Sequence, residues 1–176
     1  LQDDSLGVKA SAAGIIGKLG GGAEELEMLK AVRNNYEKSP GKRSIKTVSE
    51  DAIRVLEMDA RHAGLKLSRD ELIRELAAEL GRCAGERRDD ACGHVVERIV
   101  RGWKAGASGI LSGQAAASGG RKLYWLCRAF IRVDEESALD LLEERMKTLP
   151  DGDAKILYGV ISMGKGLRAK EILLGE

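Results

Sequence analysis

One stretch of the sequence places a tryptophan among arginines at helical spacing. Four residues share a narrow arc of a single helix and are called the Arg/Trp stripe below: Arg121, Trp125, Arg128 and Arg132. The apolar residues of the same stretch lie on the opposite side: Leu123, Leu126, Cys127 and Phe130. Arginines bind phosphate oxygens, and an exposed indole stacks on any nucleobase. The stripe therefore predicts either binding to a nucleic-acid backbone or docking of a partner protein, since Arg and Trp are also enriched at protein hot spots.

The same four residues also have a purely structural interpretation. Trp125 could pair with an arginine through a cation–π contact, or pack against another helix. The arginines could then be ion-paired with the acidic residues between 134 and 144. Helical spacing alone leaves the exposure of Trp125 open.

Further basic side chains could extend a nucleic-acid surface. A helix expected over about 90–104 carries Arg98 and Arg101 opposite its apolar face, and a basic loop follows Pro40 and Gly41. The competing interpretation of this basic loop is a solvated loop that binds nothing. The full set of candidate nucleic-acid-binding residues is Arg98, Arg101, Arg121, Lys122, Trp125, Arg128, Arg132, Lys42, Arg43 and Lys46.

The other motifs favour no chemistry. Residues 159–165 match the first seven positions of a P-loop, but Gly166 stands where a Ser or Thr should bind magnesium. A glycine-rich break between two helices explains the motif better. Four residues could nominally bind zinc but lack a close Cys-Cys knuckle: His62, Cys83, Cys92 and His94. The sequence thus predicts no catalytic residue, no metal site and no cofactor.

Charge along the chain is strongly segregated, although the formal net charge is only +1. Residues 92–132 contain seven basic side chains and one acidic one, whereas residues 134–153 contain eight acidic and two basic ones. The acidic segment could meet the basic face of a neighbouring copy, so self-association is a further expectation.

The helices that must position these residues are expected from periodicity and capping signals. A chain of 176 residues with two Trp, three Tyr and one Phe predicts an aliphatic core of packed helices rather than a sandwich or barrel. We expect an all-α bundle of six to eight helices in one domain over 23–176, after a flexible Gly/Ala/Ser-rich segment at 1–22. The expected helices cover about 23–37, 47–62, 69–81, 90–104, 120–132, 134–150, 153–163 and 167–174.

Local sequence signals indicate two helix starts and leave the structure of one stretch open. Ser68 and Glu71 have the spacing of a capping box, as do Thr47 and Glu50. The glycine-rich residues 105–120 predict either a loop or a short helix packed very closely on a neighbour.

These observations favour a binding protein over an enzyme. Three cysteines cannot all pair internally, which favours a reducing intracellular compartment, either the cytoplasm or the nucleoid or nucleus. No apolar run approaches the length of a membrane span. The leading prediction is a non-enzymatic subunit of a nucleoprotein assembly that contacts the backbone of RNA or single strands. The alternative is a helical protein–protein interaction module that docks a partner on the Arg/Trp stripe.

Overall fold

The computed structural model describes residues 6–37 and 43–175, and these residues are almost entirely helical. Nine helices occur in these ranges: α1 (Leu6–Leu19), α2 (Ala23–Glu37), α3 (Arg43–Gly64), α4 (Arg69–Gly85), α5 (Asp89–Ala116), α6 (Gly120–Val133), α7 (Glu135–Thr148), α8 (Asp151–Ile161) and α9 (Leu167–Leu174). The all-α class is confirmed, and the number of helices exceeds the six to eight expected. None of these helices is both long and apolar enough to cross a membrane.

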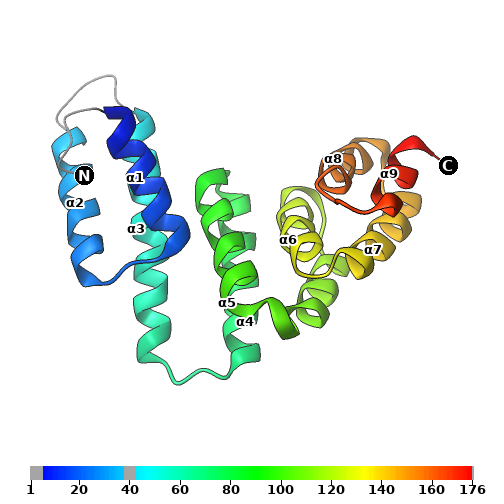
Figure 1. The fold of residues 1–176 in the computed structure, drawn as a ribbon, viewed down its shortest axis with the longest axis horizontal. Coiled ribbons are helices and arrows are strands. Elements are labelled where there is room, and N and C mark those ends of the chain that lie inside the picture. Colours follow the sequence, from blue (N-terminus) through cyan, green and yellow to red (C-terminus); the bar gives the residue numbers. More distant parts are fainter. Residues whose placement is uncertain (1–5, 38–42, 176) are drawn as a thin grey trace.

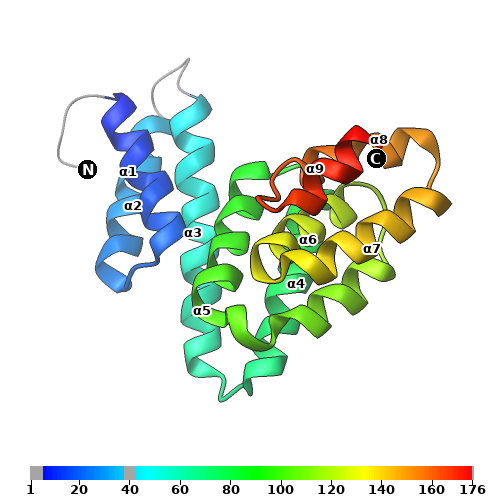
Figure 2. The same ribbon diagram turned by 45° about the vertical axis from the view of Figure 1, so that its right-hand side comes forward.

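The helices are arranged largely in chain order along an elongated molecule (Figures 1 and 2). Helices α1 and α2 pack on α3 at one end, and α7, α8 and α9 lie at the other. The hairpin of α4 and α5 lies between them, because α5 contacts α1 and α3 on one side and α6 on the other. Helix α6 contacts α4, α5, α7 and α8, so most of its circumference is covered.

The hydrophobic core has two parts. A small cluster joins the first three helices through residues such as Ala13, Leu29 and Ile53. A larger cluster runs from α3 to α9 and contains Leu80 and Phe130, both fully buried. Leu, Ile, Val and Ala dominate both clusters, as the scarcity of aromatic residues predicts.

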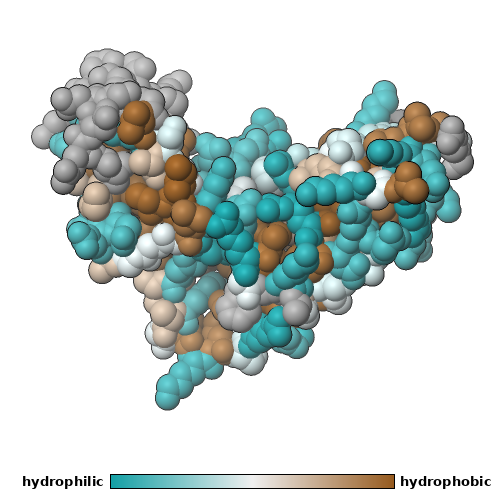
Figure 3. Space-filling view, viewed as in Figure 1, coloured by the Kyte–Doolittle hydropathy of each residue, from teal (hydrophilic) through white to brown (hydrophobic). Residues whose placement is uncertain are grey.

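The Gly/Ala/Ser-rich composition predicts a flexible segment over residues 1–22, whereas the structure forms α1 within it. Small residues explain the difference: Ala13 is fully buried, and Gly17 lies against the imidazole of His94. Apolar residues also remain on the outer side, where Val8 and Ile15 are exposed, and Figure 3 shows hydrophobic atoms over this helix. Because apolar or small residues occupy most positions around α1, the helix has no clear amphipathic period for a sequence pattern to detect.

Capping signals located some helix ends and misplaced others. The Ser68 box forms as expected: the Glu71 amide donates to Ser68 Oγ over 3.4 Å, and the Ser68 amide donates to Glu71 Oε2 over 2.8 Å. Asp134 likewise caps α7 by accepting from the Ser137 amide over 3.2 Å. Helix α3, however, begins at Arg43, before the similar Thr47 spacing, and α4 continues past Gly81 to Gly85.

The glycine-rich stretch after residue 104 is helical rather than a loop, since α5 continues to Ala116. Its regularity is interrupted at Gly106, whose φ of +95° is open to glycine but strained for other residues. The α5 ribbon changes direction near this point in Figure 1. The second half of α5 thereby reaches Asp134, which accepts a hydrogen bond from Ser108 Oγ over 2.7 Å.

At two positions in this half of α5, no close contact within the described residues requires glycine. A Cβ at Gly109 or Gly113 would meet nothing within 4 Å. We expect Gly109→Ala and Gly113→Ala each to stabilise the protein by about 0.5–1 kcal/mol, because alanine loses less conformational entropy in a helix. Urea unfolding of each variant measures the change.

Gly17→Ala is the matched control for these two substitutions, with the opposite expected sign. A Cβ at Gly17 would lie less than 3.0 Å from the ring of His94. We therefore expect this variant to lose about 1–3 kcal/mol through overpacking. A stabilising Gly17→Ala, or a destabilising Gly109→Ala, would contradict the packing described here.

Candidate binding groove

The Arg/Trp stripe of α6 faces two adjoining cavities. The first, of about 340 Å³, lies between α5, α6 and α8 and is lined by Asp89, Arg121, Tyr124, Trp125, Arg128 and Ile156. The second, of about 290 Å³, lies between α1, α5 and α6. Its lining includes Lys18, Asp89, Asp90, His94, Glu97, Trp125, Arg128 and Arg132. Because Asp89, Trp125 and Arg128 line both cavities, we treat them as one site, the Arg128 groove.

Trp125 is a wall of this groove rather than an exposed indole. Its side chain is 4% exposed and belongs to the larger hydrophobic core. The Tyr124 ring meets it edge to face, with centroids 5.2 Å apart. Its Nε1 is buried and has no hydrogen-bond partner among the described residues. Helical phase had placed Trp125 away from the apolar face of α6, but α6 is covered on several sides.

Arg128 lies over Trp125 at the centre of the groove. Its guanidinium carbon is 4.9 Å from the centroid of the indole, and its Nη1 donates to the Tyr124 hydroxyl over 3.1 Å. It is the one arginine of the groove that has no carboxylate partner in the part of the chain that the structure describes. A guanidinium stacked on a ring keeps the donors on its edge available for a carboxylate or phosphate.

The other two arginines of the stripe are ion-paired with α5. Arg121 bonds to Asp89, and Arg132 bonds to both carboxylate oxygens of Glu97 over 2.7 and 3.2 Å. The sequence had offered the acidic residues of 134–144 as partners. Three of those residues, Glu136, Asp140 and Glu143, instead pair with Arg168 of α9.

The remaining predicted basic residues do not converge on the groove. Arg101 is exposed and pairs with Glu97 over 3.4 Å, and the stem of Lys122 lies beside Gly81 of α4. Lys46 lies 3.9 Å from Glu50 within α3. Lys42 and the side chain of Arg43 lie outside the described residues.

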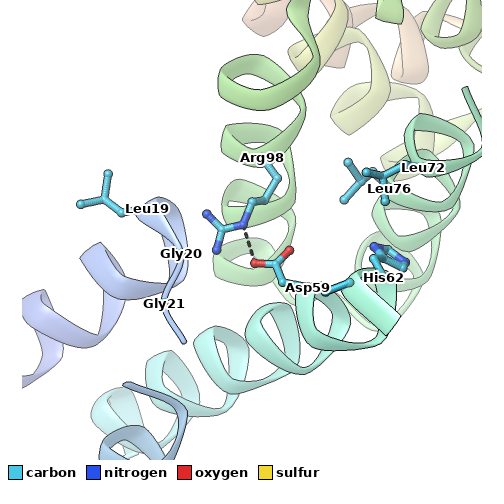
Figure 4. A pocket seen from close by; sticks show the side chains of 9 residues that line it. Leu19, Gly20, Gly21, Asp59, His62, Leu72, Leu76 and Arg98 are labelled. Carbon is cyan, nitrogen blue, oxygen red and sulfur yellow. Dashed lines mark hydrogen bonds and ion pairs between the residues drawn. The ribbon is translucent and has the colours of Figure 1, made fainter. Parts of the chain in front are cut away.

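Arg98 occupies a separate cavity of about 480 Å³, shown in Figure 4. Its Nε donates to Asp59 Oδ2 and its Nη1 to the Lys18 carbonyl oxygen, each over 2.8 Å. Burial raises the pKa of Asp59, although the charge of Arg98 acts in the other direction. These bonds join α1, α3 and α5, so Arg98 holds the N-terminal helices together and does not extend the stripe.

Several residues of the groove were not among the predicted binding residues. Lys18, Asp90, His94 and Ile156 come from α1, α5 and α8, and their convergence depends on how these helices pack. His94 is 2% exposed, and burial lowers its pKa to about 4. A neutral, buried imidazole is therefore part of the groove floor at neutral pH.

The P-loop-like motif and the cysteines have structural explanations. The amides of Lys165 and Gly166 donate to Glu135 Oε1 over 2.8 and 2.7 Å, so this chain's own carboxylate fills the place that a P-loop gives to phosphate. The three cysteines are buried and unpaired, and burial raises the pKa of Cys127 to about 12. Within the described ranges, no group of three or more potential metal ligands occurs.

No family model, curated protein or solved structure matches this chain. The fold therefore places the protein in the all-α class, and its candidate binding site is the Arg128 groove.

Proposed function

We propose that this protein is a helical interaction module that binds a segment of a partner protein in the Arg128 groove. One observation carries the proposal. Arg128 lies on Trp125 without a carboxylate partner in the described residues, in a groove whose other arginines are paired.

The geometry suits a preorganised contact. Packing on Trp125 and the bond to Tyr124 hold Arg128 in place, so little side-chain entropy remains to be lost on binding. A carboxylate on a guanidinium forms two parallel, charge-assisted hydrogen bonds. Buried Trp, Tyr and Arg side chains are also the residues that dominate protein interfaces.

The same observations favour a protein over a nucleic acid. Trp125 is too buried to stack on a base, and Arg121 and Arg132 would have to leave Asp89 and Glu97 to neutralise phosphates. Backbone binding depends on many free cations, whereas this groove offers one guanidinium at its centre.

Peptide display tests the proposal directly. Short random peptides, displayed with either end free, are selected against the folded protein, and a labelled single-stranded RNA is titrated in parallel. Arg128→Gln should weaken the selected peptides about tenfold or more, since a hot-spot contact contributes about 2 kcal/mol. Arg74→Gln, on the exposed side of α4, is the matched control and should leave binding unchanged.

Two results would contradict the proposal. Selected peptides whose affinity is the same for the wild type and for Arg128→Gln would place the interaction elsewhere. Saturable RNA binding with a steep dependence on salt, lost in Arg128→Gln, would instead support the nucleoprotein function predicted from the sequence.

A further inference from the structure

We infer that the Arg128 groove recognises the free C-terminus of a partner chain whose last residue is apolar. This inference rests on the proposed function and names the chemistry of the partner. Three observations support it: the charge balance of the groove, the apolar walls of its first cavity, and the residues that the two cavities share.

The charge balance fits a single carboxylate. The groove is lined by four basic side chains (Lys18, Arg121, Arg128 and Arg132) and three acidic ones (Asp89, Asp90 and Glu97), which leaves one positive charge in excess. Arg121 and Arg132 are already neutralised by Asp89 and Glu97. A densely acidic segment would carry more negative charge than this single excess positive charge can balance, whereas one carboxylate on Arg128 matches it.

The first cavity fits an apolar side chain. Tyr124, Trp125 and Ile156 supply its apolar walls, and Ile156 is 38% exposed although it belongs to a packed helix. A volume of about 340 Å³ is sufficient for one branched or aromatic side chain. Such a side chain would cover Ile156 and the edge of Trp125.

The carboxylate and the apolar side chain of the ligand must lie close together, because Trp125 and Arg128 line both cavities. A C-terminal residue carries its side chain and its carboxylate on the same Cα. Capture of a terminal carboxylate is an established mode of peptide recognition.

Matched peptides test this inference with the wild-type protein. The probes are fluorescein-labelled Gly-Ser-Gly-Ser-Leu with a free carboxylate, the same peptide with a C-terminal amide, and the free acid ending in serine. Fluorescence anisotropy should show the leucine acid binding at least about tenfold more tightly than either of the other two. In Arg128→Gln, the difference between acid and amide should disappear, as a double-mutant cycle requires.

A fourth probe separates the possible sources of the carboxylate: an amidated peptide in which aspartate follows leucine. If this probe binds as tightly as the leucine acid, the inference is overturned in favour of an acidic side chain. Equal binding of acid and amide, with peptides that still need Arg128, overturns the C-terminal inference while the proposed function stands. If peptides selected by display also fail to depend on Arg128, the proposed function fails with it.

Discussion

We expect acidification from pH 6.5 to pH 4 to lower the free energy of unfolding by about 3 kcal/mol through His94 alone. Burial lowers the pKa of this histidine from 6.5 to about 4 in the folded protein. The unfolded chain therefore binds a proton in this interval that the folded protein does not. Stability from the neutral imidazole is complete above pH 6.5 and is lost as the pH falls to 4, since each pKa unit corresponds to about 1.4 kcal/mol.

The surroundings of His94 explain the direction of this effect. The nearby charges of Lys18 and Arg98 oppose protonation, whereas Asp90 and a hydrogen bond with the Asp51 backbone favour it. Desolvation exceeds all of these, because the ring is enclosed between α5 and Gly17 of α1.

Urea unfolding at several pH values measures this contribution. Carboxylates with lowered pKa values, such as Glu97, also destabilise the fold in acid, so the wild type is compared with His94→Leu. Between pH 6.5 and 4, the free energy of unfolding of this variant should therefore fall by about 3 kcal/mol less than that of the wild type. His62→Gln removes the other histidine of the chain and should show the same decline in the free energy of unfolding as the wild type. Parallel curves for wild type and His94→Leu would disprove this explanation.

We expect Glu79→Gln to destabilise the fold by about 3 kcal/mol at neutral pH, because it removes the buried charge at the centre of an ion-pair network. Glu79 is 3% exposed and accepts from Arg54 Nε over 2.6 Å and Arg82 Nε over 2.7 Å. Burial acts to raise the pKa of Glu79, but the hydrogen bonds from Arg82 and Arg54 outweigh it and lower the pKa. A glutamine side chain keeps one acceptor oxygen and has an NH2 donor in place of the other, so either Arg54 or Arg82 would face a donor instead of an acceptor.

Glu75→Gln is the matched control, one turn earlier on α4 and exposed. It should change the free energy of unfolding by less than about 0.5 kcal/mol. Similar losses for Glu75→Gln and Glu79→Gln, measured by urea unfolding at neutral pH, would show that the network contributes little.

Local signals predicted those parts of the fold that depend on neighbouring residues. The capping box at Ser68 and the cap at Asp134 form as the spacing indicates, and α9 has the expected bounds, Leu167–Leu174. The two caps involve hydrogen bonds between residues three apart, which do not depend on the rest of the fold. Helix α1 was missed because its small residues pack closely against α3 and α5, and such packing leaves no period in the sequence.

The sequence by itself determined that Arg121, Trp125, Arg128 and Arg132 lie along one side of α6, because helical geometry fixes their relative directions. Only the tertiary structure decided what meets that side. Arg121 and Arg132 find their carboxylates 32 and 35 residues away in α5, and Ile156 of α8 lies beside Trp125 in the same cavity. Helical phase gives a direction but not a neighbour, so the burial of Trp125 and the availability of Arg128 depend on how α5, α6 and α8 pack.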